Sequence, residues 1–215
     1  MRFKHREHAA QLLIERLRSH YQSEKPLVLG VPRGAVPMAK MIADASHGDL
    51  DVVLVHKLSH PEQPELAIGA VDENGNAFVS RWAADLPAEY LETEISRQLA
   101  LLRSRRESYT PSRGPVDPRG RVVIVVDDGI ATGSTMTAAL RAVRAMHPKK
   151  LIGAVAVASA EAAEALSHEC DALVCLHVPD NFYAVGQFFD DFSQVTDEDV
   201  IAALQHGKET IVGAH

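Results

Sequence analysis

Two adjacent carboxylates, Asp127 and Asp128, stand between an apolar run and a stretch of small residues in the segment VVIVVDDGIATGST (122–135). The apolar run predicts a buried strand, and the sequence that follows predicts a helix. Small residues at such a junction can bind an anion, because backbone amides at a helix start point outward and the helix dipole favours negative charge. Two carboxylates would repel an anion, so the segment predicts a ligand with two chemically different parts.

The small-residue part of this segment suits a phosphate monoester. Gly129 and Gly133 permit backbone conformations that other residues rarely adopt. Thr132, Ser134 and Thr135 add hydroxyl donors. A Walker A loop has a lysine directly before its serine or threonine, and here that position holds Gly133. A loop that binds nucleoside triphosphates is therefore not expected.

The two carboxylates are expected to meet whatever is attached to that phosphate. Ionised carboxylates accept hydrogen bonds and cannot donate them, so vicinal sugar hydroxyls would suit them. A hydrated Mg²⁺ would suit them equally, because it takes oxygen ligands and keeps several waters. A ribose 5-phosphate satisfies both halves of the segment. The alternative is an ordinary strand-to-helix turn with a capping aspartate, which two acids followed by a run of small residues disfavour.

A parallel sheet would bring such loops together. Short apolar runs alternate with helical patterns, which predicts a three-layer α/β/α fold with a mainly parallel central sheet. The predicted strands are 27–31, 51–58, 122–127, 151–159 and 172–178. Ligands bind beyond the carboxyl ends of parallel strands. The loops expected to converge there are VPRGA (31–35), HKL (56–58) and DDGIATGST (127–135).

Residues 61–110 interrupt this alternation. Asn74 and Gly75 lie between two strand-like runs, which predicts a β-hairpin. The apolar spacing of AEYLETEISRQLALLRSRRESY (88–109) predicts a long helix. The chain is therefore expected to form a single domain, 1–215, into which a hairpin and a helix are inserted.

Composition excludes several classes of partner. A formal net charge of −7 argues against a general affinity for nucleic acid. No apolar run approaches the roughly 18 residues needed to span a membrane, and the charged start MRFKHREHAA is not a secretory signal. Cys170 and Cys175 have neither redox nor metal-ligand spacing and are expected to be reduced. These features predict a cytoplasmic protein with no nucleic-acid or membrane partner.

The segment 122–135 resembles the signature of the type I phosphoribosyltransferases, and GVPRGA (30–35) resembles their pyrophosphate-binding loop. The order of strands and loops agrees with that family over 27–178. The segments KLSHPEQPELAIGAV and FYAVGQFFDDF are similar to a group of uncharacterised bacterial members. The resemblance implies Mg²⁺-dependent transfer of the phosphoribosyl group of phosphoribosyl diphosphate (PRPP) to a nitrogen base, with release of pyrophosphate. The acceptor is expected to be a nucleobase, and the assembly a homodimer.

The resemblance also implies roles for individual residues. Asp127 and Asp128 would hold the ribose, Arg33 and Gly34 the pyrophosphate, and Lys57 would add a positive charge there. Asp127, Asp128 and Lys57 are the expected catalytic residues; for Lys57 alone, a surface salt bridge is the alternative. The residues expected to bind the ribose and its 5-phosphate are Asp127, Asp128, Gly129, Ile130, Ala131, Thr132, Gly133, Ser134 and Thr135. Mg²⁺ would be held mainly through PRPP and water, with no direct protein ligand assigned.

Residues 179–206 are expected to form part of a hood over the acceptor. Phe182 and Tyr183 are the candidate base-binding residues, because either ring could stack on a planar base. Packing within the hood is an equal alternative for this pair. For Phe189 and Phe192, packing is the expected role.

One departure from the family leaves the function open. Many type I members close a loop that brings a cation or a hydroxyl over the pyrophosphate, yet residues 59–80 contain no lysine or arginine. The alternative to a transferase is therefore a non-catalytic, PRPP-binding regulatory protein. Hydrolysis of a phosphoribosyl compound, with water as the acceptor, would use the same residues.

Overall fold

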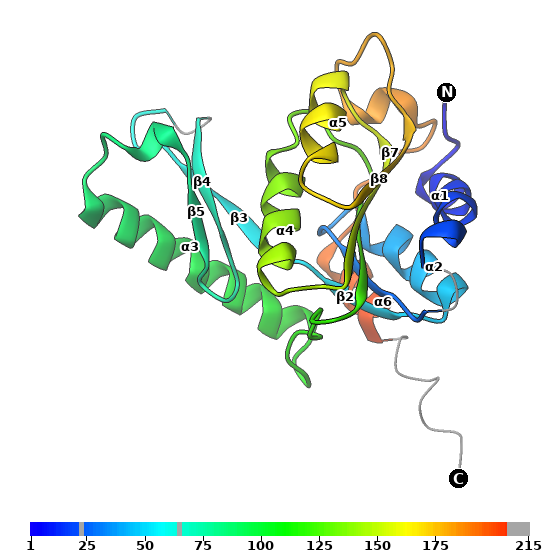
Figure 1. Ribbon diagram of the computed structural model, residues 1–215, viewed down its shortest axis with the longest axis horizontal. Helices are drawn as coiled ribbons and strands as arrows, with labels where there is room; N and C mark the ends of the chain where they lie inside the picture. The colour runs from blue at the N-terminus through cyan, green and yellow to red at the C-terminus, as the bar shows by residue number, and fades with distance from the viewer. Residues whose placement is uncertain (22–23, 64–65, 206–215) are drawn as a thin grey trace.

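A parallel sheet lies at the centre of the computed structural model, which describes residues 1–21, 24–63 and 66–205 (Figure 1). Its five strands have the order β2-β1-β6-β7-β8. Their bounds are Asp49–Val52 (β2), Leu27–Gly30 (β1), Val122–Asp127 (β6), Lys150–Val157 (β7) and Ala172–His177 (β8). The predicted end of the domain at residue 215 and the last predicted residue of the hood, 206, lie outside the described residues.

Helices cover both faces of this sheet. The helices α1 (Arg6–Tyr21) and α2 (Val36–Ser46) pack on one face, and α4 (Ser134–Ala145) and α5 (Ala160–Ser167) pack on the other. Strands buried on both faces need apolar side chains at every position, which explains their continuous apolar runs. The predicted three-layer α/β/α arrangement is therefore confirmed.

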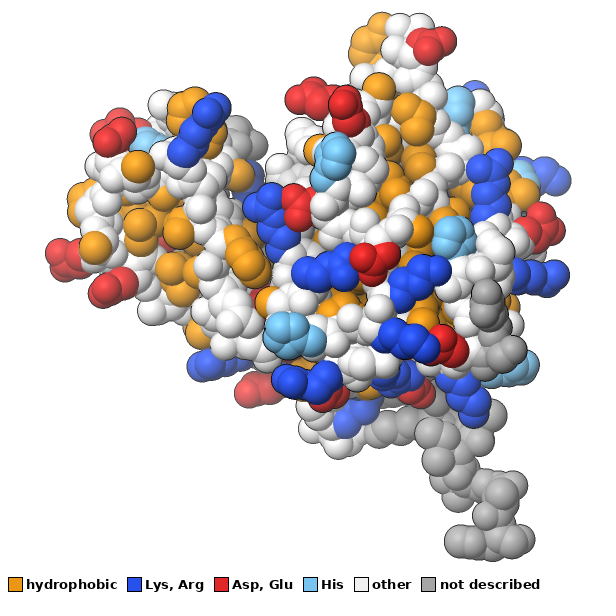
Figure 2. Space-filling view, in the orientation of Figure 1, with side chains coloured by type: hydrophobic (Ala, Val, Ile, Leu, Met, Phe, Trp, Pro, Cys, Tyr) orange, Lys and Arg blue, Asp and Glu red, His pale blue; other side chains and the backbone are white. Residues whose placement is uncertain are grey.

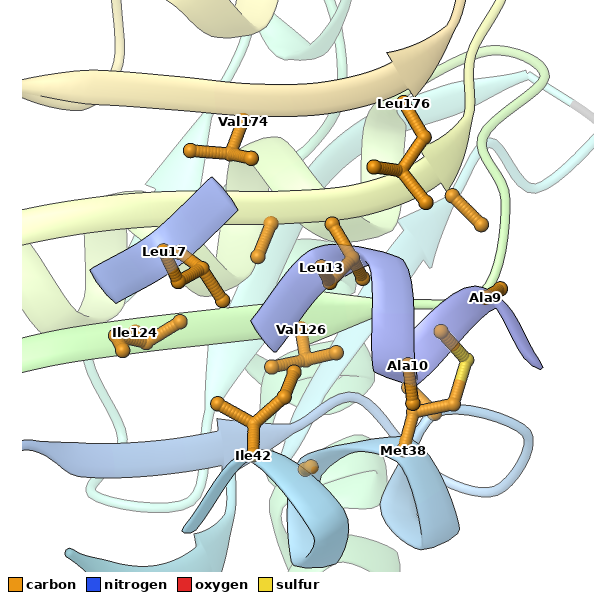
Figure 3. Close-up of a cluster of buried hydrophobic side chains, with 14 of the residues drawn as sticks. Ala9, Ala10, Leu13, Leu17, Met38, Ile42, Ile124, Val126, Val174 and Leu176 are labelled. Carbon is orange, nitrogen blue, oxygen red and sulfur yellow. The ribbon is translucent and has the colours of Figure 1, made fainter. Parts of the chain in front are cut away.

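Figure 3 shows the core between the sheet and the first two helices. Leu13 and Leu17 of α1 and Ile42 of α2 surround Ile124 and Val126 of β6. Val123 and Val125 of β6 belong to a second core, which lies between the sheet and α4. Because side chains alternate along a strand, one strand supplies both cores.

A second sheet and a long helix form an arm beside the parallel sheet (Figure 1). The sheet is antiparallel and has three strands, ordered β3-β4-β5. The bounds in the arm are Val55–Ser59 (β3), Ala67–Asp72 (β4), Ala77–Val79 (β5), Arg81–Ala83 (a 3₁₀ turn, η1) and Ala88–Tyr109 (α3). Gly75 has φ +89° in the turn between β4 and β5, as the Asn-Gly pair predicts. The predicted hairpin and long helix are both present.

The run 51–58, predicted as one strand, forms two strands in different sheets. The Val53 amide donates to the carbonyl of Gly30 in the parallel sheet. The next residue, Leu54, accepts from the amide of Glu73 in the arm. Backbone pairing therefore changes sheets between these two residues. As a result Lys57 lies within β3 of the arm, and not at the end of a parallel strand as predicted.

A buried ion-pair network joins the arm to the parallel sheet. Arg106 of α3 donates to Asp51 of β2 at 2.7 Å and to Glu73 at 2.6 Å. Arg113 donates to the second oxygen of Asp51 at 3.0 Å. The Asp51 side chain is only 1% exposed. Charges this deeply buried require partners, so the network fixes the C-terminal end of α3 against the parallel sheet.

The N-terminal residues pair with the segment after β8. Phe3 is fully buried, its amide donates to Phe188, and its carbonyl accepts from the amide of Asp190. This segment contains a 3₁₀ turn, η2 (Val185–Phe188), and leads to α6 (Asp197–Gln205), which packs on α2 and α3. Among the helices of the described residues, none is long and apolar enough to cross a membrane.

Candidate active site

The loops after β1 and β6 lie side by side at the point where the strand order of the sheet reverses direction. From β1 the chain crosses through α2 to β2, whereas from β6 it crosses through α4 to β7 on the opposite side. Loops that diverge at such a reversal leave a crevice between them, where α/β proteins commonly bind ligands. The first loop carries Arg33 and Gly34, and the second carries Asp127 and Asp128.

Gly34 and Asp128 are in close contact across this crevice. A Cβ atom at position 34 would lie 2.1 Å from Oδ2 of Asp128, so only glycine leaves room for the carboxylate. The peptide bond between Pro32 and Arg33 is in the cis form. The structure therefore brings together the two loops that sequence analysis assigned to one site.

Arg6 of α1 holds Asp128 in this position. Its Nε donates to Oδ2 of Asp128 at 2.8 Å, and its Nη1 donates to the carbonyl of Ser193 at 2.7 Å. The guanidinium also lies over the ring of Phe192, 3.9 Å from the centroid. The two charged side chains are only 11% and 12% exposed. Arg6 is a site residue that sequence analysis did not assign.

The two aspartates affect each other's ionisation. Burial, and then the charge of Asp128, raise the pKa of Asp127 well above its usual value. Burial also raises the pKa of Asp128, although the Arg6 guanidinium acts in the opposite direction. The amide of Asp128 donates to Oδ1 of Asp127 at 2.8 Å. A ligand that brings a cation or hydroxyl groups to this pair would favour its ionised form.

The segment after the aspartates forms an open loop at the start of α4. Gly133 has φ +78° and is the residue that precedes the helix, which explains the need for glycine there. The exposed residues are Ala131, Thr132, Ser134 and Thr135, whereas the amide of Ile130 donates to the carbonyl of Val157 at 2.8 Å. The amides of the first helical turn have no partner within a helix. The loop can therefore offer amides and hydroxyls to an anion, but not the amide of Ile130.

A groove of about 170 Å³ runs between the start of α4 and the small sheet. Ser134 and Thr137 line one wall, and Ala70 and Phe78 line the other. Figure 2 shows the notch between the arm and the body. Lys57 pairs directly with Ala70, and Ala70 pairs with Phe78. Because directly paired residues share a face of the sheet, Lys57 lies on the same face as Ala70 and Phe78, which border this groove.

The side chain of Arg33 reaches the start of α6. Its Nη1 lies 3.7 Å from Oδ2 of Asp197, at the first residue of α6. The hydroxyl of Tyr109 donates to the other oxygen of Asp197 at 2.5 Å. Burial and this bond raise the pKa of Tyr109 to about 12. Arg33 is half exposed, so its guanidinium has room to turn toward a ligand.

The aromatic residues of the predicted hood divide into two groups. Phe182 packs on Phe188, with ring centroids 5.4 Å apart, and Phe189 packs on Phe192 at 4.9 Å, as expected for the latter pair. Tyr183 is 86% exposed. Of the two candidate base-binding residues, only Tyr183 therefore presents a fully accessible ring.

The segment after β8 also covers the beginning of the loop 129–135. A Cβ atom at Gly129 would lie 2.3 Å from Cγ1 of Val185. Sequence analysis did not single out Val185, because its position depends on how the segment after β8 folds back. The glycine at 129 therefore permits close approach of the hood.

The donor set fits a metal ion that is held mostly by its ligand. Within the described residues, no group of three or more His, Cys, Asp or Glu side chains could hold a metal. Asp127 and Asp128 directly precede the loop 129–135. Mg²⁺ typically takes one or two carboxylates together with substrate phosphates and water. The site therefore suits Mg²⁺ that arrives with a phosphorylated ligand.

This chain belongs to the phosphoribosyl transferase domain family, whose model matches residues 4–193. Its fold is the type I phosphoribosyltransferase fold: a parallel α/β sheet with a small antiparallel sheet. The match spans both loops of the crevice, as well as Arg6 and Ser193.

Two relatives are similar to this chain over most of its length. The crystal structure of TT1426 from Thermus thermophilus shares 45% sequence identity, covers 96% of this chain and 99% of its own, and superposes with a TM-score of 0.87. A protein of Mycobacterium tuberculosis, named as a predicted phosphoribosyl transferase, is 37% identical over 206 residues and covers 94% of this chain. The chain spans 46% of the length of that relative.

Proposed function

We propose that this protein transfers the phosphoribosyl group of PRPP to a nitrogen base and releases pyrophosphate. The proposed acceptor is a nucleobase. The observation that carries the proposal is the contact between Gly34 and Asp128. It brings the loop of Arg33 against the carboxylate of Asp128, with the open loop of 129–135 beside them, and this supports sites for a pyrophosphate, a ribose and a phosphate next to one another. PRPP carries the corresponding three parts in the same order: a pyrophosphate, the ribose hydroxyls and a 5-phosphate. A cytoplasmic homodimer is part of the proposal.

The residues would act mainly by position and charge. Asp127 and Asp128 accept hydrogen bonds from the ribose hydroxyls, and the loop from Ala131 to Thr135 donates to the 5-phosphate. Arg33 turns from Asp197 to the pyrophosphate, where its planar fork matches phosphate oxygens. Lys57 approaches from the arm. Stabilising charge that builds on the departing pyrophosphate is the principal contribution expected of such groups.

Mg²⁺ fits this arrangement through the two carboxylates and the phosphate oxygens of PRPP. When bound, it would neutralise charge on the pyrophosphate. Asp127 is the carboxylate more available to the ligand or its metal-bound water, because Arg6 already occupies Oδ2 of Asp128. The planar acceptor would enter beneath the hood, where Tyr183 is the accessible ring.

A non-catalytic PRPP-binding regulator is the second candidate. Two ligand-binding groups are held by the protein itself: Asp128 by Arg6 at 2.8 Å, and Arg33 by Asp197 at 3.7 Å. The lack of lysine and arginine in residues 59–80 favours the same reading. A sensor can bind PRPP through these groups without having to stabilise a departing pyrophosphate.

Calorimetric titration with PRPP, with and without Mg²⁺, tests the proposal, followed by an assay for pyrophosphate release as nucleobases are added one at a time. Mg²⁺-dependent binding and release with one base establish the transferase and its acceptor. Release without any base indicates hydrolysis. Binding without release under any of these conditions favours the regulator. Absence of PRPP binding would show that both candidates are wrong.

Arg6→Gln is expected to lower the free energy of unfolding by about 2 kcal/mol, because the buried carboxylate of Asp128 loses a charged hydrogen-bond donor. The loss should shrink as the pH falls and Asp128 becomes protonated. Urea denaturation at several pH values measures it.

Arg2→Gln is the matched control. Arg2 pairs with Asp190 at 2.6 Å, but the two side chains are 65% and 59% exposed. Solvent screens such a pair, so its removal should cost less than about 1 kcal/mol. Equal effects of the two substitutions would show that Arg6 does not stabilise the site.

A further inference from the structure

A second cavity, of about 450 Å³, lies between α3, α6 and β3. Its walls include His56, Leu102, Ser104, Arg105, Asp197 and Ile201, and we call it the α3–α6 cavity. His56 and Lys57 are consecutive residues of β3, so their side chains project from opposite faces of the small sheet. The α3–α6 cavity is therefore separated by that sheet from the groove between α4 and the small sheet.

Two polar side chains that line this cavity have unmet bonding capacity among the described residues. Nδ1 of His56 is buried and has no hydrogen-bond partner among the described residues. On α3, Arg97 is paired with Glu94 and Arg106 with Asp51, whereas the described residues provide no ion-pair partner for Arg105. Buried polar atoms are normally paired, so the unpaired nitrogen of a residue that lines a cavity requires an explanation, and a bound ligand would supply one.

The charge of the cavity favours an anion. Burial, and then the nearby Arg105, lower the pKa of His56, which keeps its ring neutral at physiological pH. The carboxylate of Asp197 is already engaged by Tyr109 and Arg33. Within the described part of the chain, the positive charge of Arg105 therefore remains without a counterion. Leu102 and Ile201 add an apolar wall, which suits a ring.

We propose that the α3–α6 cavity binds a small organic anion that carries a ring. The anionic group would pair with Arg105, a polar group would bond to Nδ1 of His56, and the ring would lie against Leu102 and Ile201. The volume is within the range of about 300–1,000 Å³ that is usual for small-molecule sites.

Asp197 connects this cavity to the loop of Arg33. A ligand that also donates a hydrogen bond to Asp197 competes with Arg33 for that carboxylate, and this frees the guanidinium. Occupancy of the cavity would then strengthen the binding of pyrophosphate or PRPP at Arg33. This regulatory consequence rests on the proposed function, whereas binding in the α3–α6 cavity does not.

Adenosine and cytidine 5′-monophosphates are suitable probes, because each carries an anion and a ring, and inorganic phosphate serves as the ringless comparison. Calorimetric titrations would use the wild-type protein and three variants. Arg105→Gln removes the cavity cation, and Arg103→Gln removes a neighbouring exposed arginine as the matched control. Ser134→Asp adds a repelling charge to the phosphate loop. We expect at least one nucleotide to bind the wild-type protein. Its affinity should fall at least tenfold in Arg105→Gln and stay unchanged in Arg103→Gln and Ser134→Asp.

Three outcomes would overturn the proposal. Loss of binding in Ser134→Asp with retention in Arg105→Gln would place the probe in the phosphate loop. Inorganic phosphate binding as tightly as the nucleotides would remove the role of the apolar wall. Absence of nucleotide binding to the wild-type protein would show that the cavity is not a site for this class. The PRPP titration is independent of all three, so failure here leaves the proposed function standing.

Discussion

Replacing Asp127 and Asp128 together by asparagine is expected to abolish Mg²⁺-dependent binding of PRPP while leaving the fold intact. Each carboxylate would accept at least one hydrogen bond from the ribose or from metal-bound water, worth about 1.5–3 kcal/mol for a charged group. Losing two such bonds corresponds to a decrease in affinity of at least about 100-fold. Calorimetry with PRPP and Mg²⁺ measures the loss of binding, and circular dichroism checks that the fold is intact. Unchanged affinity in a folded variant would remove the central assignment of the site.

The single substitutions should change stability to different extents. The pKa of Asp127 is raised in the folded protein, so ionising it costs folding free energy as the pH rises above about 4. Asp127→Asn should therefore raise the Tm at neutral pH and lose this advantage in acid. Its amide oxygen can still accept from the amide of residue 128. Asp128→Asn should gain less than Asp127→Asn, because it removes a carboxylate with a raised pKa but also leaves the buried charge of Arg6 without a counterion.

Thermal unfolding across the pH range from acid to neutral distinguishes these effects. An Asp127→Asn protein that is less stable than the wild type at neutral pH would contradict the assignment of a buried, mutually repelling pair. Stability gained at the expense of binding is common in functional sites. If Asp127→Asn does raise the Tm, the aspartate pair is maintained for its ligand rather than for the fold.

Arg106→Met is expected to lower the free energy of unfolding by about 3–5 kcal/mol. Methionine retains most of the apolar stem but leaves Asp51 and Glu73 without their shared cation. Asp51 is almost completely buried, so water cannot replace the guanidinium. Arg113 still reaches the second oxygen of Asp51, which limits the loss but replaces none of the three bonds from Arg106 to Asp51 and Glu73. Urea denaturation followed by circular dichroism gives the magnitude.

Arg97→Met is the matched control for this prediction. Arg97 lies on the same helix and is held by Glu94 through two bonds, but its side chain is 61% exposed. Screening by solvent should keep its contribution below about 1 kcal/mol. If Arg106→Met cost no more than Arg97→Met, the buried network would not be what fixes the arm.

Much of the fold followed from patterns within single segments. The strands β1, β6, β7 and β8 are continuous apolar runs because both of their faces are buried, and this local signal identified them. The hairpin followed from Asn74 and Gly75, whose backbone preference is also local. The run 51–58 was wrong as a single strand, because its apolar pattern is the same on either side of the change in hydrogen-bond partners between Val53 and Leu54.

The site was predicted only where its residues are contiguous. The loops at 31–35 and 127–135 could be read directly, and the adjacency of β1 and β6 brings them together. Arg6 and Asp197 could not be identified, because each meets its partner across more than a hundred residues of chain. The basic start of the chain was visible in the sequence, but an arginine on a helix is usually solvated. Covariation between positions 6 and 128 is the signal that would have revealed the pair.

The position of Arg6 also has a consequence for the order in which the site can form during synthesis. Its two partners are 122 and 187 residues later in the chain. At about 5–20 residues per second, Ser193 follows Arg6 from the ribosome after roughly 10–40 s. Helix α1 rests on β7 and β8, which are also made late. A nascent chain that has just completed Asp127 and Asp128 therefore carries the two carboxylates before the hood exists to enclose Arg6 beside them.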